Sequence, residues 1–166
     1  GLGATYVTSA GDTALTIGGG VADAEIANTG TQASSDKGGF HLGVSAVTGD
    51  LTIGVGYGDG DTFVSSTAAG GNKEVDGSVL KAGISYKASE DITLALGVTS
   101  GEAKDGNFGS AGTTDDSSDS TSASVTYAVA SGVSAVVGYT TVDTNNEGAS
   151  TTDGGSAWYV GATMSF

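Results

Sequence analysis

Apolar side chains recur at every second position through nine segments of this chain. The last segment, residues 156–166, has apolar side chains at positions 158, 160, 162, 164 and 166, and the residues between them are small or polar except Tyr159. A period of two places alternate side chains on opposite faces of an extended strand. At about eleven residues this segment also has the length of a tilted strand that crosses a bilayer.

The other eight segments alternate in the same way. Tight turns and longer polar stretches connect the nine segments in turn, with loops expected at about 23–38, 58–77, 100–121 and 143–155. The repeat unit is therefore a hairpin, whereas a propeller blade would need four strands per repeat. The eight segments are residues 2–7, 15–21, 40–46, 51–57, 80–87, 92–98, 123–129 and 133–139.

Consecutive hairpins predict an antiparallel meander, and closure of such a sheet into a barrel removes its exposed edges. The predicted fold is all-β: an up-and-down antiparallel transmembrane barrel in a single domain, residues 1–166. A Gly-, Ser-, Thr- and Asp-rich chain is also compatible with disorder. Disorder does not keep the alternation in phase over nine segments, so we favour the folded barrel.

Hydropathy alone does not reveal a membrane protein here. The mean hydropathy is +0.04, and no apolar run approaches the ~20 residues of a membrane helix. Barrel strands hide their apolar content in alternation, which averages to near zero. The 30 glycines fit a wall of small side chains, and the absence of cysteine excludes disulfides and thiolate metal sites.

The charge balance excludes one class of partner. Five lysines and no arginine stand against 19 acidic residues, giving a net charge of −14. Binding of duplex DNA or RNA requires a basic face, so nucleic acid is not an expected partner.

The aromatic residues favour a membrane barrel over a soluble sandwich. They lie on the apolar parity, that is, at the alternate strand positions that carry apolar side chains; the positions between them are the polar parity. The aromatic residues fall near strand ends, in one group toward the tight turns and one toward the long loops, and the strand middles carry Val, Leu, Ile and Ala. Two aromatic girdles around an aliphatic band are typical of transmembrane barrels. The alternative is that these rings cover the rims of a sandwich core. The predicted girdle residues are Tyr6, Phe40, Tyr57, Tyr86, Tyr127, Tyr139, Trp158 and Phe166.

An orientation follows from the loop lengths. In bacterial outer-membrane barrels the short turns are periplasmic and the long loops extracellular. We therefore expect Phe166 at the periplasmic rim, Gly1 at the extracellular rim, and outer-membrane lipid and lipopolysaccharide around the wall. Because single-chain barrels have an even number of strands, a count of nine predicts that this is the C-terminal part of a larger barrel.

The closing sequence A-W-Y-V-G-A-T-M-S-F, residues 157–166, resembles the last strand of Gram-negative outer-membrane barrels, which ends on Phe. Together with the A-G-D and T-G-D turns at 10–12 and 48–50 and the glycine-rich strand end at 54–58, it makes the whole chain similar to the C-terminal half of alphaproteobacterial general porins of the Rhodobacter type. This resemblance implies a sixteen-stranded homotrimer that passes small hydrophilic solutes through a constriction formed by an infolded third loop and basic wall residues. That loop would lie upstream, and no arginine is present to supply the usual basic cluster.

The polar parity supplies the candidate pore-lining residues. Their charges are expected to shape the electric field of an aqueous pore. The alternative is that they are ordinary solvated wall residues; Lys87 lies beside a turn, and Tyr159 could pack on a plug or an infolded loop. The candidates are His41, Lys81, Lys87, Thr52, Thr93, Thr126 and Tyr159.

Acidic pairs in two predicted loops raise the possibility of structural Ca²⁺, which prefers several oxygen ligands. Asp59 and Asp61 form one group, and Asp115, Asp116 and Asp119 the other. Neither matches an EF-hand, so solvated loops are expected, with no cofactor. No nucleophile elbow or phosphate loop is present, and no enzyme activity is expected. Passive diffusion through a pore is the leading function; the alternatives are a small non-conducting barrel acting as an adhesin or structural anchor, and a secreted adhesin sandwich.

Overall fold

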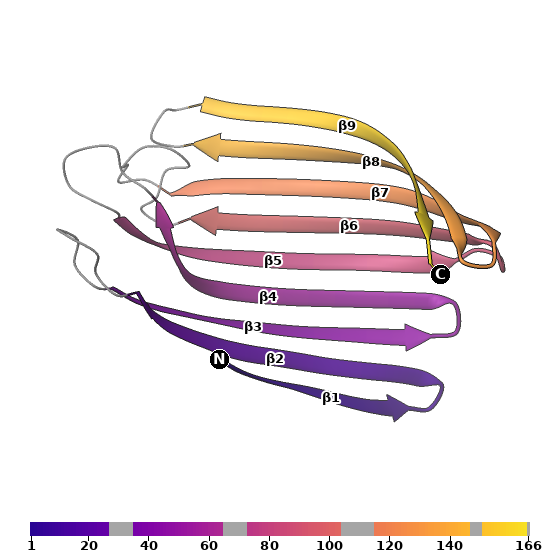
Figure 1. The fold of residues 1–166 in the computed structure, drawn as a ribbon, viewed down its shortest axis with the longest axis horizontal. Coiled ribbons are helices and arrows are strands. Elements are labelled where there is room, and N and C mark those ends of the chain that lie inside the picture. The colour runs from indigo at the N-terminus through magenta and orange to yellow at the C-terminus, as the bar shows by residue number, and fades with distance from the viewer. Residues whose placement is uncertain (27–34, 65–72, 104–114, 147–150, 166) are drawn as a thin grey trace.

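The computed structural model describes residues 1–26, 35–64, 73–103, 115–146 and 151–165, which form a single nine-stranded sheet (Figure 1). The strands follow one another in chain order, and every neighbouring pair is antiparallel. The predicted meander of nine strands is therefore confirmed. The strands are β1 (Leu2–Ala10), β2 (Thr13–Ile26), β3 (Ser35–Thr48), β4 (Leu51–Val64), β5 (Lys73–Lys87), β6 (Ile92–Ala103), β7 (Asp116–Ala130), β8 (Val133–Asn146) and β9 (Thr151–Met164).

The strands extend further into the polar segments than the alternation predicted. Asp59 and Asp61 lie within β4, where they stand opposite Ser78 and Asp76, and Asp119 lies within β7. The prediction that these acidic residues lie in loops was therefore wrong. A ladder of backbone hydrogen bonds satisfies the main chain whatever the side chains are, so the strands continue after the apolar alternation ends.

Three of the four tight turns contain a glycine with positive φ. The angles are 60° at Gly11, 55° at Gly49 and 74° at Gly132. Short hairpin loops favour positive φ because its twist matches that of the flanking strands, and glycine adopts it without steric cost. In the fourth turn the hydroxyl of Ser89 accepts hydrogen bonds from the backbone N–H groups of Asp91 and Ile92, at 3.3 and 3.1 Å.

Gly132 is under a second constraint, which predicts the cost of replacing it. An added Cβ would lie 2.6 Å from the carbonyl oxygen of Ser165, whose N–H donates to the Gly132 carbonyl at 2.8 Å. We expect Gly132→Ala to lower the free energy of unfolding by about 2 kcal/mol, compared with about 1 kcal/mol for Gly11→Ala, which has the same φ penalty but no atom within 4 Å. Urea unfolding of the lipid-folded protein measures both. Equal losses would contradict the proposed contact with Ser165.

No dry hydrophobic core forms among the described residues. Among the residues whose burial is described, the one fully buried side chain is that of Asp116, at 1% exposure. The apolar side chains of the strand middles are exposed instead: Leu94 at 42%, Val55 at 44% and Val160 at 84%. A sandwich would have packed these faces against a second sheet. No helix in the described part of the chain is long and apolar enough to cross a membrane.

Candidate functional site

One face of the sheet carries the polar parity, whose side chains are mostly small. This face is hollowed, and we call it the inner face. In an antiparallel pair, residues directly opposite each other point to the same side of the sheet. The register places Gly18 opposite Gly43, Gly43 opposite Gly56, and Gly56 opposite Lys81. Because glycine has no side chain, the surface is depressed along this row of glycines. Lys81 lies at the end of the row.

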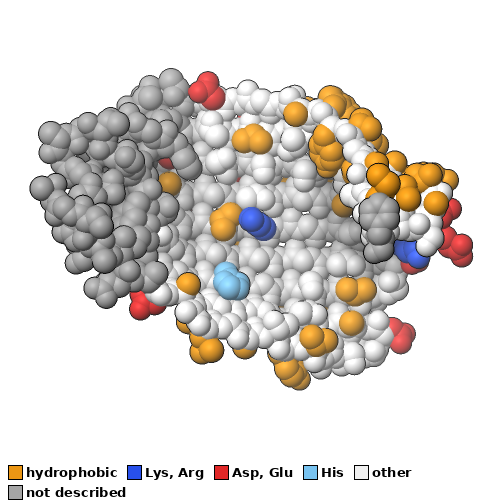
Figure 2. Space-filling view, in the orientation of Figure 1, with side chains coloured by type: hydrophobic (Ala, Val, Ile, Leu, Met, Phe, Trp, Pro, Cys, Tyr) orange, Lys and Arg blue, Asp and Glu red, His pale blue; other side chains and the backbone are white. Residues whose placement is uncertain are grey.

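A hollow of about 930 Å³ lies on the inner face over β1 to β5. Thr5, Thr16 and Ser45 supply hydroxyl groups to its lining, and His41 and Lys81 supply its nitrogen-bearing side chains. Figure 2 shows this face, with the pale blue histidine and one blue lysine near its middle. The imidazole fits because position 20 is glycine: a Cβ there would lie 2.8 Å from His41 Cε1. The hollow thus has a floor of glycine backbone, and hydroxyl groups, an imidazole and an ammonium group are part of its lining.

Beyond the hollow, strand β7 lines the inner face with hydroxyl groups. On β7 the inner positions from 118 to 126 read Ser, Ser, Ser, Ser, Thr. The alternation did not reveal Ser118 and Ser120, because the predicted loop extended to Thr121. Counting the parity back from Thr126 would have found them. A wall of hydroxyls offers both donors and acceptors to water and to polar solutes.

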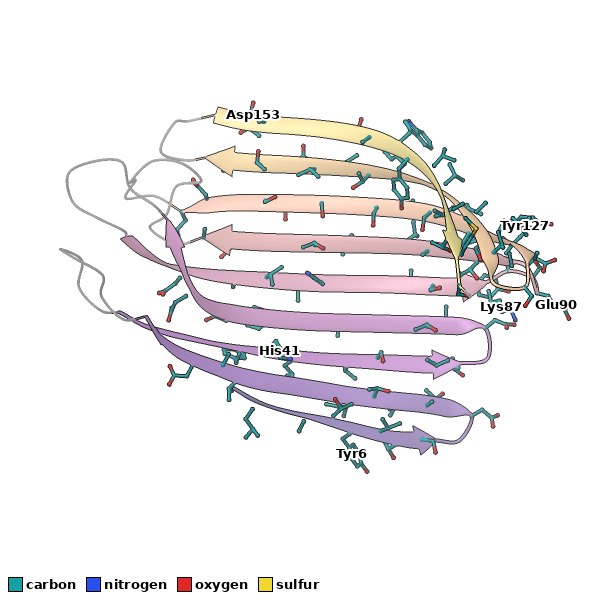
Figure 3. The ribbon with its side chains drawn as sticks, viewed as in Figure 1. Tyr6, His41, Lys87, Glu90, Tyr127 and Asp153 are labelled. Carbon is teal, nitrogen blue, oxygen red and sulfur yellow. The ribbon has the colours of Figure 1, made fainter. Side chains whose placement is uncertain are left out.

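All seven predicted pore-lining residues lie on the inner parity, but they do not form one cluster. His41 and Lys81 line the hollow. Thr93 stands opposite both Lys87 and Thr126, so these three form a second row near the tight turns, where Figure 3 places Lys87. The two remaining candidates have partners of their own, with Thr52 opposite Ser85 and Tyr159 opposite Gly138. Their role in lining a pore stays a prediction.

The ring of Tyr159 lies across Gly138 of the neighbouring strand. An ideal Cβ on Gly138 would overlap Cζ and Oη of Tyr159 and would lie 2.6 Å from its Cε1. The aromatic ring thus takes the place of the missing side chain, a pairing that protects glycine in sheets. Within the described residues, Tyr159 packs on the wall itself, which is one of the alternatives that the sequence left open beside a plug or an infolded loop.

The opposite, outer face carries the predicted girdle aromatics. Phe40 and Tyr57 make a tilted ring contact with centroids 5.9 Å apart, and Tyr139 and Trp158 make another at 4.7 Å. These four form the upper row, toward the longer connections. Tyr6, Tyr86 and Tyr127 form the lower row, toward the tight turns; Phe166 lies outside the described residues.

The two rows run across the sheet at the same inclination. Following the register from Tyr6 leads through Ile17, Val44 and Val55 to Ala82, four residues before Tyr86 and four strands away. The lower row therefore moves one residue toward the turns for each strand crossed. At ~3.3 Å per residue and ~4.8 Å between strands, this is an inclination of about 35°.

The upper row repeats this inclination. Following the register from Phe40 across β4 to β8 leads to Thr152 of β9, six strands away. Trp158 lies six residues closer to the tight turns than Thr152, so this row also moves one residue toward the turns for each strand crossed. Strands of transmembrane barrels tilt by about 35–45°. If both rows lie parallel to the membrane plane, the strands are therefore tilted from the membrane normal by the angle that a barrel requires.

The acidic residues at the loop end make local hydrogen bonds. The hydroxyl of Tyr57 donates to Asp59 Oδ2 at 3.0 Å, and the Gly38 N–H donates to Asp61 Oδ2 at 3.0 Å. In the described ranges no group of three or more His, Cys, Asp or Glu residues could hold a metal ion.

The fold is similar to a solved structure, the outer-membrane expressed OmpT of Vibrio cholerae, with a TM-score of 0.61 at 19% sequence identity. The match covers 95% of this chain and 53% of that chain, so the nine strands correspond to about half of a porin barrel. No protein-family model matches the sequence, and no curated protein does. At this identity the similarity shows the fold alone.

Proposed function

We propose that this sheet is part of the wall of an outer-membrane channel through which small hydrophilic solutes and ions diffuse without a chemical step. The observation that carries the proposal is the difference in side-chain chemistry between the two faces of the sheet. The outer face exposes aliphatic side chains between two inclined aromatic rows, and the inner face is lined by glycine, serine and threonine. A continuous apolar surface of this kind is unfavourable in water and marks a contact with lipid or protein.

Closure of the sheet completes the proposal. Within the described residues β1 pairs with β2 alone and β9 with β8 alone, so each leaves one edge unpaired. Lipid cannot satisfy such edges, and transmembrane sheets close into barrels for that reason. We infer that further strands pair with β1 and β9, as the 53% coverage of the porin match suggests, giving about sixteen strands. Small inner side chains would leave a barrel of that width open to water.

The finer features of the proposal rest on the sequence. They are the long connections facing the cell exterior, the tight turns facing the periplasm, a homotrimer, contacts with lipopolysaccharide, and the resemblance to porins of the Rhodobacter type. The glycine floor of the hollow argues against a small barrel whose lumen is filled by side chains, as a pure anchor or adhesin would have.

Reconstitution tests the function directly. We expect the complete barrel that contains this sheet to fold only with detergent or lipid, to migrate faster on gels before heating than after, and to give discrete current steps with a linear current–voltage relation in planar bilayers. A barrel that inserts without conducting would support the anchor. A protein that is folded and monodisperse in detergent-free buffer would contradict the membrane assignment.

A further inference from the structure

Acidic and basic residues are sorted between the two faces of the described strands. Among the side chains that the structure describes, the outer parity takes nearly all the acidic residues, and the inner parity takes His41, Lys81 and Lys87. Within this described set, Asp116 and Asp153 are the only acidic residues of the inner parity. The outer acidic residues of the set are Asp23, Asp59, Asp61, Asp76, Glu102, Asp119 and Asp143. The chain carries a net charge of −14, yet this sorting leaves its inner face with a basic centre.

The two inner acidic residues do not neutralise that centre. Asp116 is buried at 1% exposure, at the loop end of β7. Asp153 is exposed on β9, and the register places it six strands from His41, a separation of about 29 Å across the sheet. Figure 3 shows Asp153 at the loop end of the far edge strand. Among the described residues no carboxylate forms an ion pair with Lys81.

His41 and Lys81 lie at the same level of the wall. Phe40 stands in register with Ser78 of β5 through Asp59 of β4. With the inclination of one residue per strand, the upper aromatic row reaches β5 at Leu80. His41 follows Phe40 by one residue and Lys81 follows Leu80 by one. Both basic residues therefore lie one residue from the upper row, on its tight-turn side. Figure 2 shows the histidine and one lysine near the middle of the hollowed face, with acidic side chains at its margins.

We propose that this part of the wall selects for anions and that Lys81 is its principal specificity determinant. The inference deepens the proposed function and rests on it. The ammonium of Lys81 faces Gly56 across one strand pair and Thr99 across the other, so small neighbours leave it open to passing solutes. The ligands are small anions, such as chloride and solutes that carry a carboxylate or phosphate group. Charge on the outer face is separated from the lumen by the sheet, and at 0.1 M salt it is screened beyond about 10 Å.

Zero-current potentials in a salt gradient test the proposal. For an ion that passes about 7 Å from the ammonium at 0.1 M salt, Lys81→Gln is expected to lower the anion-to-cation permeability ratio by about threefold, and Lys81→Glu by about ninefold. Glu102→Gln changes the charge of the chain by one unit on the outer face and is the matched control, with no expected change in the ratio. The Lys81 effect is expected to fade at 1 M salt, where the screening length is about 3 Å.

The two proposals fail in different ways. Absence of any conductance from the inserted barrel would overturn the channel itself. A conducting barrel in which Lys81→Gln leaves the permeability ratio unchanged, or raises it, would leave the channel standing and overturn the anion preference of this wall. A rise in the ratio from Glu102→Gln, as large as the fall from Lys81→Gln, would also overturn it, since the total charge of the chain would then matter more than the face on which the charge lies.

Discussion

Replacing Leu96 with arginine is expected to lower the free energy of unfolding in lipid by about 2–4 kcal/mol. Leu96 lies on the outer face of β6, with Ile84 and Ala123 on either side, and its side chain is 58% exposed. Its level is close to midway between the two inclined aromatic rows. A guanidinium at that depth loses its hydration to hydrocarbon, and the cost is greatest at the bilayer midplane.

The neighbouring position provides a matched control. Ala95 points to the inner face, between Ser85 and Ser124. Ala95→Arg adds the same side chain one residue away, where water and hydroxyl groups solvate it, and we expect a stability change within about 0.5 kcal/mol. Urea titration of vesicle-folded protein measures both variants. Trp158, the one tryptophan of the chain, is 75% exposed on the outer face and reports the transfer from lipid to water by fluorescence.

The sign of this comparison separates a membrane wall from a water-soluble sheet. In water, Leu96→Arg would remove exposed apolar surface and would leave the stability unchanged or improve solubility. A stable Leu96→Arg variant beside a destabilised Ala95→Arg variant would mean that the two faces have been assigned the wrong way round.

The alternation of apolar residues was sufficient to predict the number and order of the strands and which side chains share a face. It was not sufficient to predict strand length. Apolar alternation stops near Tyr57 on β4, yet the strand continues to Val64, since hydrogen bonding to β5 does not depend on an apolar face. The sequence signal of a barrel strand thus marks the apolar band and not the whole strand.

The alternation was also not sufficient to predict the register between neighbouring strands. A slip of two residues keeps every side chain on its face, so the alternation does not exclude it. Both the inclination of the aromatic rows and the shared level of His41 and Lys81 depend on that register. The packing of Tyr159 on Gly138 depends on it too, which explains why a plug seemed as reasonable a partner for Tyr159 as the wall.

Among alanine substitutions of inner-face glycines, Gly138→Ala is expected to cause the largest loss, about 1–3 kcal/mol of unfolding free energy. The new methyl group would occupy the space of the Tyr159 ring, which packs against the glycine backbone. Either the ring rotates off the wall into the lumen or the β8–β9 pairing shifts. The first outcome would also reduce the single-channel conductance, because a phenol ring would then project into the water-filled path.

A double-mutant cycle isolates that contact from general effects of the substitution. Removing the ring in Gly138→Ala/Tyr159→Ala should recover most of the stability that Gly138→Ala loses, with a coupling energy of about 0.5–3 kcal/mol. Gly54→Ala is the matched control, because its nearest atoms, the Val44 carbonyl oxygen and Ser45 Cβ, lie at ordinary contact distances of 3.7 and 3.8 Å. Equal behaviour of the Gly138 and Gly54 variants, or additive effects in the cycle, would show that Tyr159 does not rest on Gly138 in the folded protein.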